Sequence, residues 1–463
     1  MRAEDRLRYE ISKCRNCEAC RSHVNFSCLV FPEMFRLVDK ERETGEKITT
    51  DELMDLINLC NFCGACPCLD IRAAIMEAKT EYMDKSGLSF KIRAIENVER
   101  IGKWGGAIPQ LTNFLFKNEI TRGVLGKTVG IHGERKIPNF PKENFPEWIK
   151  SRKENIKSRA EGKKKVAYFA GCTARYLFPD VAKAVVEVLE RNGMQVYYPE
   201  QQCCGMPSLL EGDRKLTLEF TRFNVDRLAD LVEEGYDIVC SCPTCGYMLK
   251  NVLKIGAYYS KEYLEQVESD DDFVLIPVAD GMLSVSAFAR VPKRYLGAVL
   301  KDEGYFSSIK PKKRIMVAEN TYDMGEYLRM LHERDELDTR LRSVPVRVVY
   351  YPPCHLREQR IGRPYEYLLS LIPGLSVDSI DGNYCCGNGG IMGFKEEFHH
   401  SSIKIASRLI AKIKSLTPDV LVTDCLSCRI QFNQLTPYKV LHPIQIVGES
   451  YSNYQEQIEN KEI

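Results

Sequence analysis

The sequence predicts a mostly helical α+β domain followed by two duplicated α/β domains. Three observations lead to this fold class. Two cysteine runs lie near the N-terminus, a second cysteine pattern occurs twice, and short apolar strands alternate with amphipathic helices around each copy of that pattern. Such alternation favours parallel sheets, because a crossover helix carries the chain back to the start of the next strand.

Composition is that of an ordinary globular protein, with 44% hydrophobic and 28% charged residues. The formal net charge is +1, so electrostatics give no reason to expect nucleic acid as a partner. The N-terminal MRAEDRLRYE lacks the apolar stretch of a secretory signal. No run reaches the roughly 18 apolar residues that a membrane-spanning helix needs. We therefore expect a cytoplasmic protein.

Eight cysteines lie in two short runs near the N-terminus. The runs hold Cys14, Cys17, Cys20 and Cys28, and then Cys60, Cys63, Cys66 and Cys68. Two successive C-x₂-C-x₂-C triplets are typical of a two-cluster bacterial ferredoxin, in which each cluster takes its fourth ligand from the other run. By this rule we assign Cys68 to the first triplet and Cys28 to the second, although neither has the ferredoxin spacing. The alternative is a pair of zinc sites, which usually combine two distant cysteine pairs.

Helices are expected between and after these runs. A helix is predicted from Thr50 in the stretch between the runs, and another over Ile71–Tyr82. The stretch Lys103–Ile131 mixes large apolar residues with basic ones. We expect it to pack in the core, although it is also the best local choice for a membrane-surface or partner-binding segment. Prolines between residues 138 and 146 then mark a linker, followed by a basic run up to Lys165.

The second cysteine pattern occurs twice in the same register. The first copy comprises Cys172, Cys203, Cys204, Cys242 and Cys245, and the second comprises Cys354, Cys385, Cys386, Cys425 and Cys428. Spacings within the two copies agree to within one residue, which indicates an internal duplication. Each copy gathers five thiols, one more than a Cys₄ metal site needs.

Strands are predicted directly before the cysteines of each copy. The predicted strands are 165–170, 196–199, 237–240, 346–350 and 419–423, with a further short strand before Cys385, and the predicted helices between them are 181–191, 218–234, 365–371 and 402–414. Parallel sheets place their ligands at the carboxyl ends of the strands, so the cysteines of each copy should gather at one edge. Residues 256–344 show no counterpart of the repeat.

The whole arrangement resembles the CCG-domain iron–sulfur family. The pattern Cys…Cys-Cys-Gly…Cys-x-x-Cys is present twice after two ferredoxin-type runs. This family includes the catalytic subunit of heterodisulfide reductase and an iron–sulfur subunit of anaerobic glycerol-3-phosphate dehydrogenase. The segments VVYYPPCH, YCCGNGGIMGFKEE and LVTDCLSC and the HPI at His442 resemble the dehydrogenase protein. The complete first copy is more similar to the reductase protein.

The resemblance implies a domain organisation and a set of cofactors. Residues 1–100 would form a ferredoxin-like domain with two cubane [4Fe-4S] clusters, and residues 163–255 and 345–450 would form Rossmann-like CCG domains. The five cysteines of each CCG domain would hold one noncubane [4Fe-4S] cluster. The alternative at either site is zinc or an ordinary cube on four thiols. Residues 101–162 would be a helical connector and linker, 256–344 an inter-repeat segment and 451–463 a tail.

The resemblance also implies a function. The chain would be an iron–sulfur electron-transfer subunit of an anaerobic redox complex, linking a flavoprotein dehydrogenase or electron-transfer flavoprotein to quinone or a membrane partner, at the inner face of the membrane. The alternatives are a heterodisulfide reductase-type subunit that reduces a disulfide at paired noncubane clusters, and a cluster- or zinc-stabilised scaffold. No Walker or G-x-G-x-x-G motif follows a strand, so we expect no bound nucleotide or flavin.

Three cysteines and one histidine are expected at the reacting site. These are Cys354, Cys385, Cys386 and His355. His355 would deliver a proton, since histidine titrates near neutral pH. The alternative for His355 is a hydrogen bond to a cluster thiolate or to the backbone. Cys240 has Thr423 at its place in the second copy, so we expect it to be buried near the site rather than to be a ligand.

Overall fold

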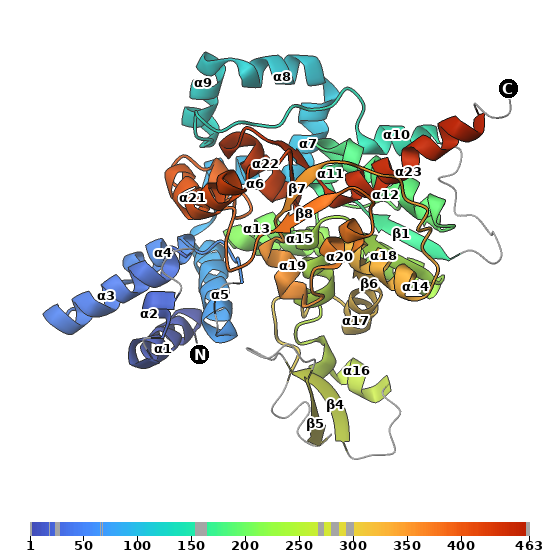
Figure 1. The fold of residues 1–463 in the computed structure, drawn as a ribbon. Helices are drawn as coiled ribbons and strands as arrows, with labels where there is room; N and C mark the ends of the chain where they lie inside the picture. Colours follow the sequence, from blue (N-terminus) through green and yellow to red (C-terminus); the bar gives the residue numbers. More distant parts are fainter. Residues whose placement is uncertain are drawn as a thin grey trace.

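Figure 1 shows the computed structural model of the protein, coloured from blue at the N-terminus to red at the C-terminus. The structure describes residues 2–17, 19–23, 28–64, 66, 68–152, 164–266, 273–278, 287–292 and 301–459. Within these ranges the chain forms a helical head, a helical connector and two domains with parallel sheets. Most of the expected basic linker, residues 153–163, lies outside the described residues.

The head is helical and has its own apolar core. Its elements are α1 (Ala3–Cys17), α2 (Cys20–His23), α3 (Val30–Thr44), α4 (Thr50–Asn58) and α5 (Leu69–Ser86). Leu7, Phe31 and Leu37 are buried between these helices. Helix α4 begins with a capping box, in which the side chains of Thr49 and Glu52 each accept the other's backbone N–H. Both helices predicted in this region are confirmed.

The connector carries α6 (Phe90–Glu96), α7 (Val98–Ala107), α8 (Pro109–Lys117), α9 (Glu119–Val129) and α10 (Phe145–Ser151). The expectation that residues 103–131 pack in the core is wrong for their largest side chains. Trp104 is 78% exposed, Phe114 67% and Ile120 79%. The physical reason is that α8 and α9 pack mainly on each other and on α6 and α7, and stand at the edge of the molecule (Figure 1). None of the described helices is long and apolar enough to cross a bilayer.

The first sheet is built around β1. Its strands are β1 (Lys165–Phe169), β2 (Gln195–Tyr197), β3 (Tyr236–Cys240) and β6 (Thr321–Asp323), in the parallel order β2-β1-β3-β6. The helices are α11 (Gly171–Tyr176), α12 (Pro179–Arg191), α13 (Met206–Glu211), α14 (Arg214–Glu233) and α15 (Pro243–Tyr247). In the register, Val166 lies beside Val196, and Ala167 beside Ile238. The predicted strands and long helices are confirmed here.

Strand β6 comes from the segment between the two copies, where no counterpart of the repeat was expected. The segment follows η1 (Met248–Val252) and also holds η2 (Ala257–Tyr259), α16 (Lys261–Gln266), the antiparallel pair β4 (Phe273–Val278) and β5 (Ala287–Pro292), α17 (Pro311–Glu319) and α18 (Met324–Glu333). Because β6 pairs in parallel with β3, the end of this segment completes the first sheet. The sequence did not predict this strand, because a strand of only three residues leaves little periodic signal.

The second sheet has the same topology as the first. Its strands are β7 (Arg347–Tyr350), β8 (Ser376–Ser379), β9 (Val420–Val422) and β10 (Lys439–Leu441), in the parallel order β10-β9-β7-β8. The helices are α19 (Cys354–Gln359), α20 (Pro364–Ser370), η4 (Met392–Phe394), α21 (His399–Leu416), α22 (Leu426–Leu435) and α23 (Pro443–Glu459). Helix α23 runs into the residues that were expected to form a tail.

The two sheet domains exchange their last helices. Helix α18 follows β6 of the first domain and packs on α20 of the second, whereas α23 follows β10 of the second domain and packs on α12 of the first. Val185, Leu328, Leu368 and Ile444 therefore share one buried apolar cluster. Each domain completes its core with a helix of the other, so the two form one packed unit.

Candidate functional site

The first cysteine set lies at the carboxyl ends of β1, β2 and β3. Cys172 begins α11, Cys203 and Cys204 precede α13, and Cys242 and Cys245 surround the start of α15. The sulfur of Cys203 is 3.6 Å from that of Cys172. The Cys204 thiol contacts Cys203 and Cys245, and Cys242 contacts Cys245. The structure thus brings together all five thiols that the sequence grouped.

The second set repeats this arrangement on the second sheet. Cys354 begins α19, Cys385 and Cys386 follow β8, and Cys425 and Cys428 lie at the start of α22. The sulfurs of Cys428 and Cys386 are 3.0 Å apart. Cys354 is half-buried and the other four are buried. Because parallel strands carry these cysteines, their side chains meet at one edge of the sheet.

The second cysteine of each adjacent pair is the more acidic thiol. Hydrogen bonds from Cys203 and Cys245 lower the pKa of Cys204 to about 6. Likewise, hydrogen bonds from Cys385 and Cys428 lower the pKa of Cys386 to about 6. Metal ligation requires the thiolate, so both sets present a donor that loses its proton readily. Thiolate sulfur is the usual ligand of iron–sulfur clusters, and sets of five thiols fit such a group.

The two sets touch each other. The Cys242 thiol of the first set hydrogen-bonds with Cys425 of the second. The hydroxyl oxygen of Thr244 lies 3.8 Å from the Cys425 sulfur and 2.9 Å from Nδ1 of His355. Helices α15 and α19, which carry these residues, pack directly on one another. Sites on different sheets are therefore adjacent in space.

The head brings its eight cysteines into two groups. Burial raises the pKa of the Cys14 thiol to about 11, and the neighbouring charges that add to this shift include Cys20 and Cys68. Burial raises the pKa of Cys28 to about 12, and the neighbouring thiols there are Cys63 and Cys60. Cys17 neighbours Cys14 and Cys20, and Cys66 neighbours Cys60, Cys63 and Cys28. These neighbours match the crossover grouping of the sequence analysis.

The head contacts the second cysteine set. Cys63, Cys354 and Cys385 pack in one small apolar cluster, and a hydrogen bond joins Cys63 to Cys385. The side-chain nitrogen Nδ2 of Asn61 lies 3.6 Å from the Cys385 sulfur. A sequence of contacts therefore runs from the head to the second set and, through Cys425, to the first.

His355 has a partner at each ring nitrogen. Its Nε2 lies 3.1 Å from the backbone oxygen of Phe62 in the head, and its Nδ1 lies by Thr244. Its ring stacks on that of Tyr247, with centroids 5.2 Å apart. Burial lowers the pKa of His355. This geometry fits a residue that holds the head against both sheet domains, and the role of His355 as a proton donor stays a prediction.

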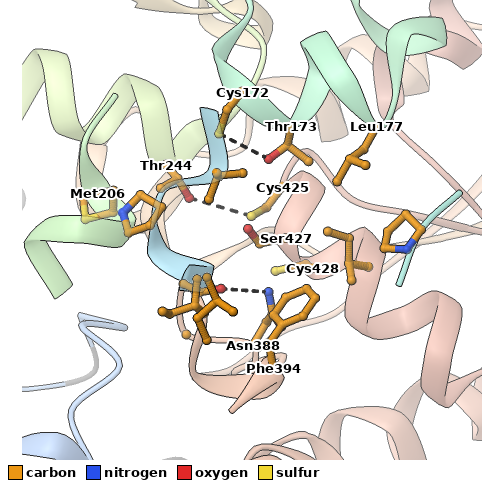
Figure 2. Close-up of a pocket in the computed structure, with 18 of the residues that line it drawn as sticks. Cys172, Thr173, Leu177, Met206, Thr244, Asn388, Phe394, Cys425, Ser427 and Cys428 are labelled. Carbon is orange, nitrogen blue, oxygen red and sulfur yellow. Dashed lines mark hydrogen bonds between the residues drawn. The ribbon is translucent and has the colours of Figure 1, made fainter. Parts of the chain in front are cut away.

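A cavity of about 180 Å³ lies beside the second set. Its lining includes all five cysteines of that set and, from the first set, Cys172. Figure 2 shows Cys172, Cys425 and Cys428 around this cavity. The connector and the head contribute further side chains, among them Ile101, Phe116, Phe140 and Cys63. None of the described residues that line it is Lys, Arg, Asp or Glu. The second cysteine set therefore opens onto a mainly apolar space.

Sequence reasoning missed most of this lining. Phe116 and Phe140 come from the connector, where only helices and a linker were expected. Asn388 follows the Cys-Cys-Gly motif, and its Oδ1 accepts a hydrogen bond from the buried Arg135 at 2.8 Å. The apolar stripe of residues 103–131 was the sequence feature that could have indicated the part of the lining contributed by the connector. Cys240 is buried in β3 as expected.

A group of two histidines and a glutamate lies beside the site. The ligand atoms of His132, Glu134 and His399 are within 4.8 Å of one another. However, the rings of His132 and His399 stack with centroids 4.2 Å apart and planes inclined by 14°. Their nitrogen lone pairs lie in the two ring planes, which are stacked and nearly parallel, so the lone pairs do not converge on one ion. We interpret the group as a packing contact between the connector and α21.

Comparisons with known proteins agree with this architecture. The cysteine-rich domain model CCG matches residues 166–250 and 348–433. The chain is 24% identical over 378 residues to a subunit of the anaerobic glycerol-3-phosphate dehydrogenase of Escherichia coli, covering 81% of each chain. It is 26% identical over 306 residues to a subunit of the fumarate reductase (CoM/CoB) of Methanothermobacter marburgensis, covering 62% of this chain and 47% of that one.

A further relative covers a similar part of the chain. Lactate utilization protein A of Halalkalibacterium halodurans is 25% identical over 303 residues, which is 63% of this chain and 100% of the relative. The two CCG matches coincide with the two sheet domains and contain the ten cysteines of the doubled pattern. The resemblance found in the sequence is thereby confirmed at the level of the domains: the chain carries two cysteine-rich domains of the CCG type.

Proposed function

We propose that the chain is an iron–sulfur electron-transfer subunit that passes electrons from a flavoprotein partner to a quinone at the membrane surface, in a complex of anaerobic metabolism. The observation that carries this proposal is the series of contacts from Cys63 of the head to the second cysteine set, which opens onto an apolar cavity. The similar proteins are subunits of a dehydrogenase and a reductase, which supports a role within a complex.

The residues that would hold the clusters follow from the groups described above. A ferredoxin-like head would bind two cubane [4Fe-4S] clusters, one on Cys14, Cys17, Cys20 and Cys68 and one on Cys28, Cys60, Cys63 and Cys66. Two Rossmann-like CCG domains would each bind a noncubane [4Fe-4S] cluster on their five cysteines. Iron–sulfur clusters, when bound, take up and release single electrons.

The order of the sites suits an acceptor of two electrons. The second set contacts the head through Cys385 and the first set through Cys425. Two sites with the same cysteine pattern thus lie next to one cavity, and reduction of a quinone to a hydroquinone takes two electrons and two protons. The buried thiols and the apolar walls keep water away from the place where electrons would leave.

The cavity lining favours a quinone over charged acceptors. A quinone is a flat apolar ring with carbonyl oxygens that accept hydrogen bonds, and Thr173, Asn388 and Ser427 supply polar groups among the apolar walls (Figure 2). A disulfide of anionic thiol coenzymes would instead call for cationic side chains. The described lining contains neither lysine nor arginine.

The decisive experiment offers the two acceptor classes to the same protein. Protein purified without oxygen and reduced with dithionite, then freed of excess reductant, is mixed with a short-chain quinone or with a mixed disulfide of thiol coenzymes. We expect the quinone to bleach the reduced-cluster spectrum many times faster than the disulfide does. Rapid oxidation by the disulfide and none by the quinone would contradict the proposal.

A second candidate function is supported by the contact between Cys242 and Cys425. It brings two complete cysteine sets together, as the reduction of one disulfide by two one-electron donors would require. In that reaction the S–S bond breaks, and each sulfur takes one electron and then one proton. The acceptor experiment separates this function from the first, because only a disulfide-reducing protein would release two thiols.

The connector presents a surface suited to a lipid bilayer. Exposed apolar side chains gather on α7, α8 and α9, and comprise Trp104, Ile108, Leu111, Phe114, Leu115, Ile120 and Val124. The exposed Lys117 and Lys127 lie on the same helices. Apolar residues with neighbouring lysines are typical of surfaces that enter the headgroup region of anionic membranes. Because Phe116 of α8 lines the cavity, this surface and the proposed quinone site share one helix.

Membrane contact predicts a loss of vesicle binding when this surface becomes polar. We expect the double variant Trp104→Ser, Ile120→Ser to lose at least about 90% of its binding to vesicles of phosphatidylcholine and phosphatidylglycerol, since each buried large side chain contributes about 2 kcal/mol and about 1.4 kcal/mol is a tenfold change in affinity. Flotation of the whole protein measures this binding. Ile255→Ser is the matched control, because Ile255 is 62% exposed but lies at the end of the first CCG domain, outside α7, α8 and α9. Equal flotation of both variants would contradict membrane binding through this surface.

A further inference from the structure

Arg135 is a buried cation beside the cavity. It is 1% exposed and belongs to the segment between α9 and α10. Its Nη1 donates to the amide oxygen of Gln431, and its Nη2 donates to that of Asn388 at 2.8 Å. The guanidinium lies over the ring of Phe394, 4.3 Å from its centroid. All three partners are uncharged.

No described carboxylate pairs with this guanidinium. Its Nε is buried and has no hydrogen-bond partner among the described residues. Burial lowers the pKa of Arg135 to about 10, and the one charge that opposes this shift is that of Cys386 in the second cysteine set. A buried cation without an opposite charge is strongly destabilising. A negatively charged group bound next to Cys386 would supply the counter-charge for Arg135 that the described protein residues do not provide.

A second arginine adds to the positive charge around the second set. Arg357 lies near Cys354 and Cys385, and its hydrogen bonds go to the backbone oxygens of Pro352 and Tyr384. The charged groups that act on it among the described residues are Tyr351 and cysteines, and none is a carboxylate. The second set therefore has two arginines beside it whose contacts are with uncharged groups.

The first set has a different charge environment. Arg175 is likewise buried, and the negative charge of the Cys172 thiolate helps to raise its pKa. However, its Nη1 lies 2.9 Å from a carboxylate oxygen of Glu99, so the pair is close to neutral as a whole. The same type of residue is thus neutralised by protein at one site and not at the other.

We infer that Arg135 is the counter-charge of an anionic cluster on the second cysteine set, and that it makes this set the more readily reduced of the two. Adding an electron makes a cluster more negative, so a nearby unpaired cation favours the reduced state. Electrons that arrive from the head would then be held at the site that lines the cavity. This inference deepens the proposed function, on which its assignment of the exit site rests.

The test is a redox titration of the whole protein without oxygen, followed by EPR. The signal of the second site is identified as the one that disappears in Cys385→Ser. In Arg135→Met, which keeps the size but not the charge, we expect the midpoint potential of that signal to shift to more negative values. In Arg135→Lys, which keeps the charge, we expect most of the shift to be reversed.

The matched control is Arg175→Met at the first site. Because the charges beside Arg175 are those of Glu99 and of Cys172 in the first set, its removal should leave the midpoint potential of the second site in place. An unchanged potential in Arg135→Met with full iron content would overturn the inference, as would equal shifts in the Met and Lys variants, which indicate a structural role. If Arg135→Met does not retain iron, Arg135→Gln provides the uncharged comparison. The potentials are measured without a quinone. The titration therefore tests the role of Arg135 even if the acceptor experiment contradicts the proposed function.

Discussion

Replacing Cys386 by serine is expected to remove one cluster and to abolish reduction of the acceptor. Cys386 is buried, contacts Cys385 and Cys428, and has a pKa of about 6, so it is the thiol of the second set that is most ready to bind metal. Serine oxygen is a poor substitute for thiolate at iron. With four sites of about four irons each, the variant should lose about a quarter of its iron. Iron analysis and EPR of protein prepared without oxygen measure this loss.

Cys240→Ala is the control for this prediction. Cys240 is also a fully buried cysteine of a sheet domain, but it lies within β3 and ahead of the turn that carries Cys242 and Cys245. We expect its iron content and its rate of acceptor reduction to stay close to those of the unaltered protein. Loss of iron in Cys240→Ala but not in Cys386→Ser would contradict the assignment of ligands. Stoichiometric zinc in place of iron would contradict the redox function as a whole.

The second large effect is expected from Gly387→Ala. Gly387 has a φ of 81°, and a Cβ added to it would lie 2.1 Å from the backbone oxygen of Ser402. Its N–H also donates to the Cys385 sulfur at 3.3 Å. We expect a loss of at least about 3 kcal/mol of stability, because left-handed strain of about 1–2 kcal/mol adds to a clash with rigid backbone. The second site should also lose its iron.

Gly205→Ala tests the same motif without the clash. Gly205 has a φ of 89°, but an added Cβ there would meet its nearest neighbour, a Thr221 methyl group, at 3.4 Å. Only the strain of about 1–2 kcal/mol is expected, and the first site should keep its iron. Thermal unfolding monitored by circular dichroism, together with iron analysis, compares the two variants. Equal destabilisation would show that backbone strain alone explains the glycine at each site.

The cysteine sets could be predicted from the sequence because their order along the chain reflects local geometry. Short spacings such as Cys242 to Cys245 hold thiols on one turn, and a preceding strand places that turn at the edge of a sheet. The duplication made the second set recognisable from the first. The resemblance to CCG domains followed from the same pattern, and two such domains are matched at these positions.

The cavity and its surroundings could not be predicted in this way. Phe140 and Arg135 reach the site through packing between segments that are far apart in the chain, and nothing in their neighbouring residues marks them. The apolar stripe on α8 was recognised, but whether such a stripe is covered depends on what packs against it. Strand β6 escaped prediction because three residues do not establish a period. Long-range packing explains each of these differences.

The exchange of α18 and α23 has a consequence for the origin of the chain. A protein with a single repeat would leave the apolar surface of its first helix bare and its last helix without a partner. In a dimer of such a protein, the last helix of each copy could pack on the first helix of the other copy across a twofold axis. The present chain therefore has the architecture of a homodimer whose two halves became fused. After fusion, the two halves could diverge in sequence and take different functions.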